Sequence, residues 1–167
     1  MLAVLCLPTS IQASDFVEGK NYHTLDKKVT LQKSDKIEVL MFLWYGCSGC
    51  YKLDDRITAW ADKLPDDIVF KRLPALFFPH WEFHGRIFLT MDALGATYAQ
   101  HHAIFDLIQK DKVKIETEAD LPVVIAKAGV DKDKFMEIFR SVETTEKMED
   151  LQSLLFEYEL QAVPAMV

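Results

Sequence analysis

The chain has 167 residues, of which half are hydrophobic, and its formal net charge is −7 at pH 7. This length suits one domain with room for an insertion, and the apolar fraction is sufficient for a substantial core. Because like charges repel, the acidic balance argues against nucleic acid and anionic membrane surfaces as main partners.

The N-terminal residues have the composition of a secretory signal. An apolar run at residues 2–7 is followed by a polar stretch in which Ala13 offers a small residue for cleavage. The run is too short to cross a bilayer, and no Lys or Arg precedes it. We therefore expect residues 1–13 to be a partial signal peptide, with an ordinary N-terminal segment as the alternative. Removal would take Cys6 away and leave one close pair of cysteines, which suits an exported protein in an oxidising compartment.

Residues 15–36 are mostly polar, with apolar islands at 21–25 and 29–31. We expect one of these islands to form an edge strand. His23 is expected at the surface or at that edge.

The stretch that contains two cysteines is the most informative part of the chain. Residues 37–45 are β-formers with one charge among them, which predicts a central strand buried on both faces. Gly46 ends this run, and Cys47 and Cys50 follow with two residues between them. Apolar residues then recur at helical spacing, namely Leu53, Ile57, Trp60, Ala61 and Leu64. The cysteines are therefore expected in the first turn of a helix.

Cysteines in that position are suited to redox chemistry. Free backbone N–H groups and the positive end of the helix dipole stabilise a thiolate, and residues three apart can close a disulfide. A zinc site is the weaker interpretation, because no cysteine follows Cys50 and the spacing of His80 and His84 fits no zinc motif. A purely structural disulfide would stabilise little, because the loop it closes is so short.

The rest of the chain predicts one more strand and then helices. Residues 68–73 predict a strand ended by Pro74, and a strand–helix–strand unit makes the two strands parallel. From residue 79 to about 158 the periodicity is helical. The apolar stripes comprise Trp81, His84, Ile87, Phe88, Met91 and Leu94, then Tyr98, His101, Ile104, Phe105 and Ile108, then Phe135, Ile138 and Phe139, then Met148, Leu151, Leu155 and Tyr158. The histidines among them, and the adjacent His102, are expected to pack rather than to bind ligands.

Helix ends are marked by residues with known terminal preferences. Gly95 and Gly129 are expected just after two of the helices. Asp131 can cap the next helix, and Thr144 or Thr145 is expected to open the last one.

Together these residues resemble the DsbA family of periplasmic thiol oxidoreductases. The matching pieces are Trp44-Tyr45-Gly46-Cys47 with Cys50-Tyr51, residues 72–77, Trp81, His84-Gly85, residues 88–90 and Val163-Pro164. The resemblance implies an α/β protein with a thioredoxin fold, formed by residues 14–78 and 144–167, and an inserted all-helical domain at 79–143. By the same comparison the last strands and the terminal helix are missing from the given chain.

The resemblance also implies roles for individual residues. Cys47 would be the exposed nucleophile and Cys50 its buried resolving partner, so that their redox-active disulfide takes the place of a cofactor, with no metal. Val163 and Pro164 would form the cis-proline loop and bind substrate together with nearby Trp44 and Tyr45. The implied partners are folding exported proteins with free cysteines and a quinone-linked membrane protein that restores the disulfide in the periplasm.

This chain departs from the family at three positions, and together with Arg72 we expect these residues to tune the redox properties. Ser48 and Gly49 stand where the family usually has Pro-His. Met41 stands where a glutamate is common, six residues before the first cysteine, and its presence would leave Arg72 unpaired.

Formation of disulfides in exported proteins is therefore the leading functional prediction. Because Ser-Gly lacks the histidine that favours a thiolate, a reductase or isomerase on the same scaffold is the close alternative. A non-catalytic peptide-binding or chaperone module that uses the apolar surface near Trp44 and Tyr45 is the third.

Overall fold

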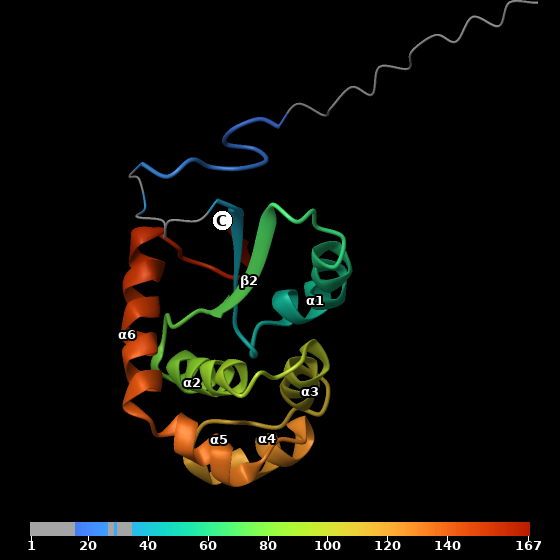
Figure 1. The fold of residues 1–167 in the computed structure, drawn as a ribbon, viewed down its shortest axis with the longest axis vertical. Helices are drawn as coiled ribbons and strands as arrows, with labels where there is room; N and C mark the ends of the chain where they lie inside the picture. Colours follow the sequence, from blue (N-terminus) through green and yellow to red (C-terminus); the bar gives the residue numbers. More distant parts are fainter. Residues whose placement is uncertain (1–15, 27–28, 30–34) are drawn as a thin grey trace, which may run out of the picture.

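The computed structural model describes residues 16–26, 29 and 35–167 (Figure 1). Within them, a three-stranded sheet has β1 (Ile37–Leu43) at its centre. The strand β2 (Ile68–Pro74) pairs with β1 in parallel, and β3 (Ala165–Met166) pairs with it in antiparallel orientation. The sheet confirms that the apolar run forms the central strand and that β1 and β2 are parallel. The short β3 follows the Val-Pro pair.

The residues of β1 alternate between two hydrophobic cores. Leu40 and Phe42 pack against the apolar side of α6 (Val142–Glu157). Leu43 belongs to a second core, which it forms with Cys50 and with buried residues of the helices at the end of the sheet. The predicted burial on both faces therefore holds for the C-terminal half of the strand, whereas its first residue is exposed.

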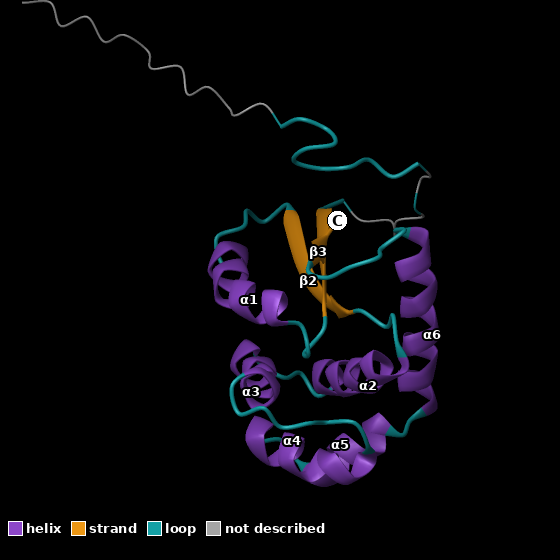
Figure 2. Cartoon of the chain, turned by 180° about the vertical axis from the view of Figure 1, so that it is seen from behind, coloured by secondary structure: helices purple, strands orange, loops and turns teal. Residues whose placement is uncertain are grey.

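Helices cover one end and two sides of the sheet. They are α1 (Ser48–Ala61), α2 (Pro79–Ala93), α3 (Tyr98–Gln109), α4 (Leu121–Ala128), which follows a short 3₁₀ turn (Glu118–Asp120), α5 (Lys132–Phe139) and α6. Figure 2 shows α2 to α5 gathered beyond the end at which β1 and β2 finish, and α6 running back alongside the sheet. We call α2 to α5 the helical layer. No helix in the described part of the chain is long and apolar enough to cross a membrane.

The helical layer approaches the sheet closely at one glycine. A Cβ atom on Gly85 of α2 would lie 2.2 Å from Cδ2 of Leu76, in the segment that follows β2. No larger residue fits there unless Leu76 moves, because atoms at that distance overlap. Gly85 therefore lets α2 pack directly against the chain that leaves the sheet.

Most of the predicted helix ends are confirmed. Gly95 and Gly129 have φ values of 70° and 64°, the left-handed conformation that favours glycine after a helix. The side chain of Asp131 accepts a hydrogen bond from the backbone of Lys134, as expected of a cap. The prediction that Thr144 or Thr145 opens the last helix is wrong, because Ser141 caps α6, which begins at Val142.

The expected edge strand before β1 is not found in the described residues. Residues 21–25 form no strand, and only an isolated bridge between Glu18 and Tyr22 occurs there. Most of the island at 29–31, and the expected signal peptide at 1–13, lie outside the described residues. His23 is exposed, as predicted.

Candidate active site

The two cysteines stand at the start of α1, as the sequence predicts. Cys47 is the N-cap residue, and its Sγ accepts a hydrogen bond from the backbone N–H of Cys50 at 3.1 Å. Cys47 is half-buried, whereas Cys50 is only 1% exposed. This difference agrees with the expected exposure of the two thiols. A first-turn N–H group, that of Cys50, is therefore directed at the Cys47 sulfur, where it would stabilise an anion.

The environment of Cys50 keeps its thiol protonated. Burial is the main cause that raises the pKa of Cys50 far above its usual value, and the contact with Cys47 raises it further. A buried thiolate has lost its hydration, which is why the charged form is disfavoured. The pair thus combines one sulfur that accepts a hydrogen bond from a backbone N–H with one that holds its proton.

The Val-Pro loop lies directly beside Cys47. The Val163–Pro164 bond is cis, as predicted, and the Cys47 thiol donates to the Val163 carbonyl at 3.6 Å. A Cβ atom on Gly49 would lie 3.5 Å from Cδ of Pro164 and 3.7 Å from the Cys47 sulfur. With glycine at position 49, no side chain separates the sulfur from the proline ring.

Trp44 and Tyr45, expected to bind substrate, take different positions. The Trp44 indole folds beneath Gly46, where an added Cβ would lie 2.1 Å from it, and stacks on Trp81 with 4.1 Å between ring centres. Trp44 is half-buried and lines a groove, so a substrate can reach it. Tyr45 is 1% exposed. Its side chain is therefore not part of the surface that a substrate meets.

The expectation that Arg72 is unpaired is wrong. Arg72 Nε lies 3.5 Å from Oδ1 of Asp54, and its Nη2 donates to the Thr58 hydroxyl at 2.7 Å. Asp54 projects from α1 and is 2% exposed. Met41 is buried opposite Arg72 in the strand register. The Asp54 carboxylate from α1 therefore pairs with Arg72. The presence of Met41 in place of an acid does not leave the arginine unpaired.

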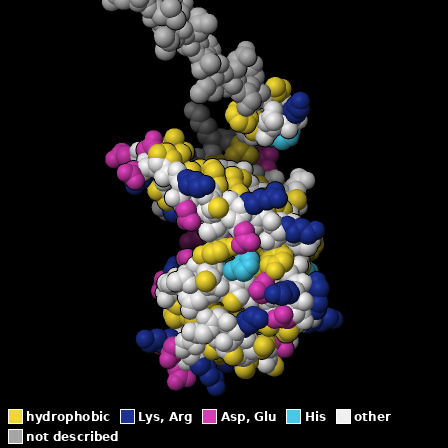
Figure 3. Space-filling model, turned by 90° about the vertical axis from the view of Figure 1, so that its right-hand side faces the viewer, with side chains coloured by type: hydrophobic (Ala, Val, Ile, Leu, Met, Phe, Trp, Pro, Cys, Tyr) yellow, Lys and Arg dark blue, Asp and Glu magenta, His cyan; other side chains and the backbone are white. Residues whose placement is uncertain are grey.

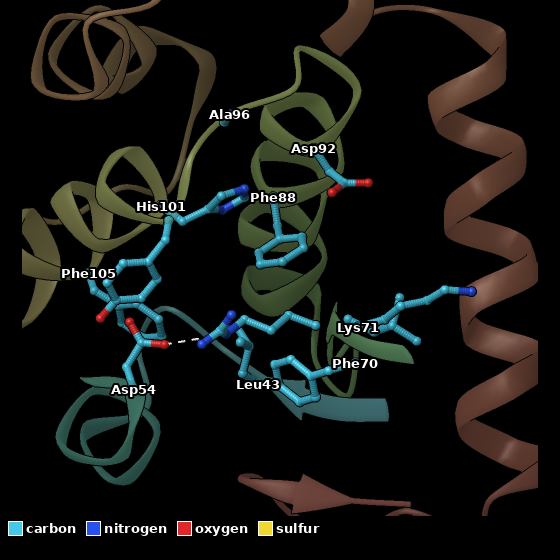
Figure 4. A pocket seen from close by; sticks show the side chains of 12 residues that line it. Leu43, Asp54, Phe70, Lys71, Phe88, Asp92, Ala96, His101 and Phe105 are labelled. Carbon is cyan, nitrogen blue, oxygen red and sulfur yellow. Dashed lines mark ion pairs between the residues drawn. The ribbon is translucent and has the colours of Figure 1, made fainter. Parts of the chain in front are cut away.

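Asp54 and Arg72 line a cavity of about 310 Å³ between the sheet and the helical layer (Figure 4). In the figure Asp54 points into the cavity from α1, His101 from α3 and Phe88 from α2. Asp54 also contacts Nδ1 of His102 at 3.0 Å. At this cavity α1 and the helical layer are therefore joined by the polar contact between Asp54 and His102.

Three residues of α3 form hydrogen bonds with the segment 44–46 before Cys47, which we call the active-site loop, and with α1. Nδ1 of His101 lies 2.6 Å from the Tyr45 hydroxyl, and Gln109 donates to the Tyr45 carbonyl at 2.8 Å. The Tyr51 hydroxyl donates to Asp106 at 2.6 Å. Burial, with a smaller contribution from Arg72, lowers the pKa of His101 to about 4, so the imidazole is neutral and accepts from Tyr45. The expectation that the histidines of these stripes only pack therefore missed the polar contacts of His101 and His102.

One of the missed residues carries a detectable sequence signal. Asp54 follows Cys50 by four residues and so lies on the inward face of the predicted helix, where an unpaired carboxylate would be costly. The partner of Asp54 could not be read from spacing, because β2 supplies it. Among the described residues, no group of three or more His, Cys, Asp or Glu side chains could hold a metal ion.

Comparison with known proteins relates this chain to bacterial redox proteins. No protein-family model matches the chain. It is 40% identical over 158 residues to the thiol:disulfide interchange protein DsbA of Azotobacter vinelandii, which covers 95% of this chain and 74% of the relative. A crystal structure of Pseudomonas aeruginosa DsbA superposes with a TM-score of 0.82 at 38% identity, over 86% of this chain and 74% of that one.

A third comparison is with a peptide complex. The structure of a cysteine-to-serine variant of Proteus mirabilis DsbA, in complex with the non-covalently bound peptide PWATCDS, matches with a TM-score of 0.78 at 23% identity, over 92% of this chain and 82% of that one. The structural matches confirm the predicted α/β thioredoxin fold.

Proposed function

The chain belongs to the DsbA family and is a thiol:disulfide oxidoreductase, and we propose that it works as an oxidant that forms disulfides in exported proteins. The observation that carries the proposal is the pairing of Cys47 at the helix N-cap with a buried, protonated Cys50. We also propose that residues 79–143 form an inserted helical domain between the two thioredoxin-like parts, 14–78 and 144–167.

The reaction is a pair of thiol–disulfide exchanges. A substrate thiolate attacks Sγ of Cys47, the Cys47–Cys50 bond breaks, and Cys50 leaves with the electron pair and takes up a proton. The raised pKa of Cys50 favours that protonation. A second substrate thiolate then attacks the substrate sulfur of the mixed disulfide, and Cys47 leaves as a thiolate. The two substrate thiols lose two electrons and two protons; the cysteine pair takes up both electrons, Cys50 takes up one proton, and the other proton goes to solvent while Cys47 is a thiolate.

The geometry at Cys47 supports the oxidising direction. A thiolate at the N-cap is stabilised by the Cys50 N–H and by the dipole of α1. A stabilised thiolate is a good leaving group, and it makes the reduced pair favourable, so the disulfide form is the stronger oxidant. Ser48 and Gly49 add no cation, which keeps a reductase or isomerase as the second candidate.

The substrate is proposed to be an extended polypeptide that carries a cysteine. The Val163 carbonyl lies beside Cys47, where it can accept a hydrogen bond from a backbone N–H of the bound substrate, as in β-strand addition. Backbone pairing gives affinity without demanding a particular sequence, which suits an enzyme with many substrates. The peptide bound to the Proteus mirabilis relative contains a cysteine and supports this substrate class.

We further propose a periplasmic location and reoxidation by a quinone-linked membrane protein. The family membership supports both. Nucleic acid is not proposed as a partner. On the face drawn in Figure 3, acidic and basic side chains are both spread over the surface, and the net charge is −7.

Three measurements test the proposal. The disulfide form should oxidise a reduced, unfolded protein that has two cysteines, and Cys47→Ser should abolish this. Full activity of Cys47→Ser would instead favour a chaperone module. A reduction potential of about −120 mV identifies an oxidant, and one of about −270 mV a reductant. Alkylation of the reduced protein, followed by mass spectrometry, should label Cys47 before Cys50, and the reverse order would overturn the assigned roles.

A further inference from the structure

We propose that a groove beside Cys47 is a substrate subsite for an acidic side chain, recognised by Lys112 and Lys114. The inference rests on the proposed function, because it concerns the polypeptide that reacts with the same cysteine pair.

The groove has a volume of about 320 Å³ and lies between the active-site loop, the start of α2 and the segment that follows α3. Trp44 and Gly46 line one side, and Lys112 and Lys114 line another. Gly46 directly precedes Cys47, so the groove begins one residue from the nucleophile. A polypeptide that delivers a cysteine to Cys47 therefore has its neighbouring residues within reach of the groove.

The two lysines are held at the rim by the residues between and after them. Val113 packs against the core, and Ile115 is buried, with its carbonyl accepting a hydrogen bond from Nε2 of His84 at 2.7 Å. Neighbouring residues of an extended segment point in opposite directions. Between the inward-directed Val113 and Ile115, Lys114 is therefore directed outward. Lys112 stands just before this extended stretch, with a left-handed φ of 60°, and both lysines are exposed.

The charge in the groove is suited to a carboxylate. Neither Lys112 nor Lys114 forms an ion pair with a described residue, whereas Lys127 on the neighbouring helix pairs with Asp111 at 2.8 Å. The groove contains a single carboxylate, that of Glu116. An acidic group on the substrate would therefore meet two ammonium groups against one carboxylate, on a protein whose net charge is −7.

The floor of the groove is aromatic and accommodates the apolar part of the same side chain. The rings of Trp44 and His80 lie edge to face with 5.4 Å between their centres, and both residues line the groove. Aliphatic carbons pack well on such surfaces, while the carboxylate reaches the lysines at the rim. This combination favours Asp or Glu over a small polar residue.

The position of the acidic residue relative to the substrate cysteine follows from strand geometry. The substrate cysteine must face the enzyme to react with Cys47. In an extended chain, residues two apart share a face. The acidic side chain is therefore expected two positions from the cysteine.

The test uses peptides that contain a single cysteine and, two positions away, Asp, Ser or Lys. Two sets of three are prepared, one with the variable residue before the cysteine and one with it after. The rate at which each peptide forms a mixed disulfide with the oxidised protein is followed by acid quenching and mass spectrometry. Each peptide is compared between the wild type and the double variant Lys112→Glu/Lys114→Glu, so that the intrinsic reactivity of the peptide thiol cancels. For at least one arrangement, charge reversal should slow the Asp peptide about two- to fivefold, leave the Ser peptide nearly unchanged and accelerate the Lys peptide.

A matched control separates the groove from net charge. Lys132→Glu/Lys134→Glu changes the net charge equally, but these exposed residues lie on α5, away from the groove lining. The control should leave all three rates near wild type, and added salt should remove the effect of the groove variant. Equal responses of the three peptides, or equal effects of the two double variants, would overturn the inference. Failure of every peptide to react with the wild type would instead contradict the proposed function.

Discussion

The Tyr45 hydroxyl donates a hydrogen bond to Nδ1 of His101, with 2.6 Å between the two atoms, and so joins the active-site loop to α3. Tyr45 precedes Cys47 by two residues, and His101 belongs to the helical layer. The position of the active-site loop therefore depends on a histidine that must stay neutral to accept this hydrogen bond.

The first prediction concerns the pH dependence of stability. Burial lowers the pKa of His101 from 6.5 to about 4 in the folded protein. Between these values the unfolded chain binds a proton that the folded protein does not. The stability that this group contributes is thus complete above pH 6.5 and is lost as the pH falls toward 4. In His101→Asn, the denaturant midpoint should change less steeply over that range, and His23→Asn, at an exposed site, serves as the control. Equal slopes for wild type and His101→Asn would contradict the prediction.

The second prediction concerns Gly46. An alanine there would place its Cβ 2.1 Å from the Trp44 ring, which is itself held by Trp81. Gly46→Ala should therefore lower the free energy of unfolding by about 1–3 kcal/mol through overpacking, measured by urea denaturation. Gly49→Ala is the matched control, because its Cβ would make only ordinary contacts of 3.5 Å or more. A larger loss for Gly49→Ala would show that the packing beneath the loop is not the constraint.

The third prediction concerns the ion pair between Asp54 and Arg72. Asp54→Ala leaves the partly buried Arg72 without its carboxylate and should destabilise the protein by about 2–4 kcal/mol. Arg72→Met in the Asp54→Ala background removes the stranded cation, so the double variant should recover part of this loss. The four proteins form a double-mutant cycle measured by chemical denaturation. Additive effects would mean that the two side chains are not energetically coupled.

The fourth prediction concerns the dipeptide between the cysteines. Ser48→Pro with Gly49→His places an imidazole next to the Cys47 sulfur and Pro164, where Gly49 now leaves space. A cationic imidazole stabilises the thiolate, so the reduction potential should rise by about 30 mV or more, a tenfold change for a two-electron couple. Equilibration with glutathione measures this, and Ser48→Pro alone separates the effect of the ring from that of the charge. An unchanged potential in the double variant would show that other groups set the redox properties.

Local patterns in the sequence predict much of the fold. The apolar run into Cys47, the cap at Asp131 and the glycines at 95 and 129 each depend on neighbours within a few residues, and the structure confirms them. The start of α6 was missed because Ser141 and the two threonines all have cap-forming side chains, and spacing does not choose among them.

Contacts between distant segments were the part that could not be predicted. The absence of an acid at Met41, in the adjacent strand, predicts that Arg72 lacks a partner, whereas Asp54 reaches it from α1. Tyr45 was expected near the substrate, but His101, more than fifty residues later, holds it inside. Both outcomes depend on how α1 and α3 pack together, which no local pattern specifies.

The pairing of Met41 with Met166 has a consequence for how the protein becomes active during its synthesis. β1, α1 and β2 are close in sequence and can associate early, whereas contacts between distant segments form late because closing a long loop costs entropy. A nascent chain that ends within the helical layer already carries both cysteines but has no Val163 carbonyl beside them. If Val163 aligns the substrate as proposed, the thiol pair of such a chain is present before that surface exists, and we expect disulfide transfer to begin only after residues 163–166 have joined the sheet.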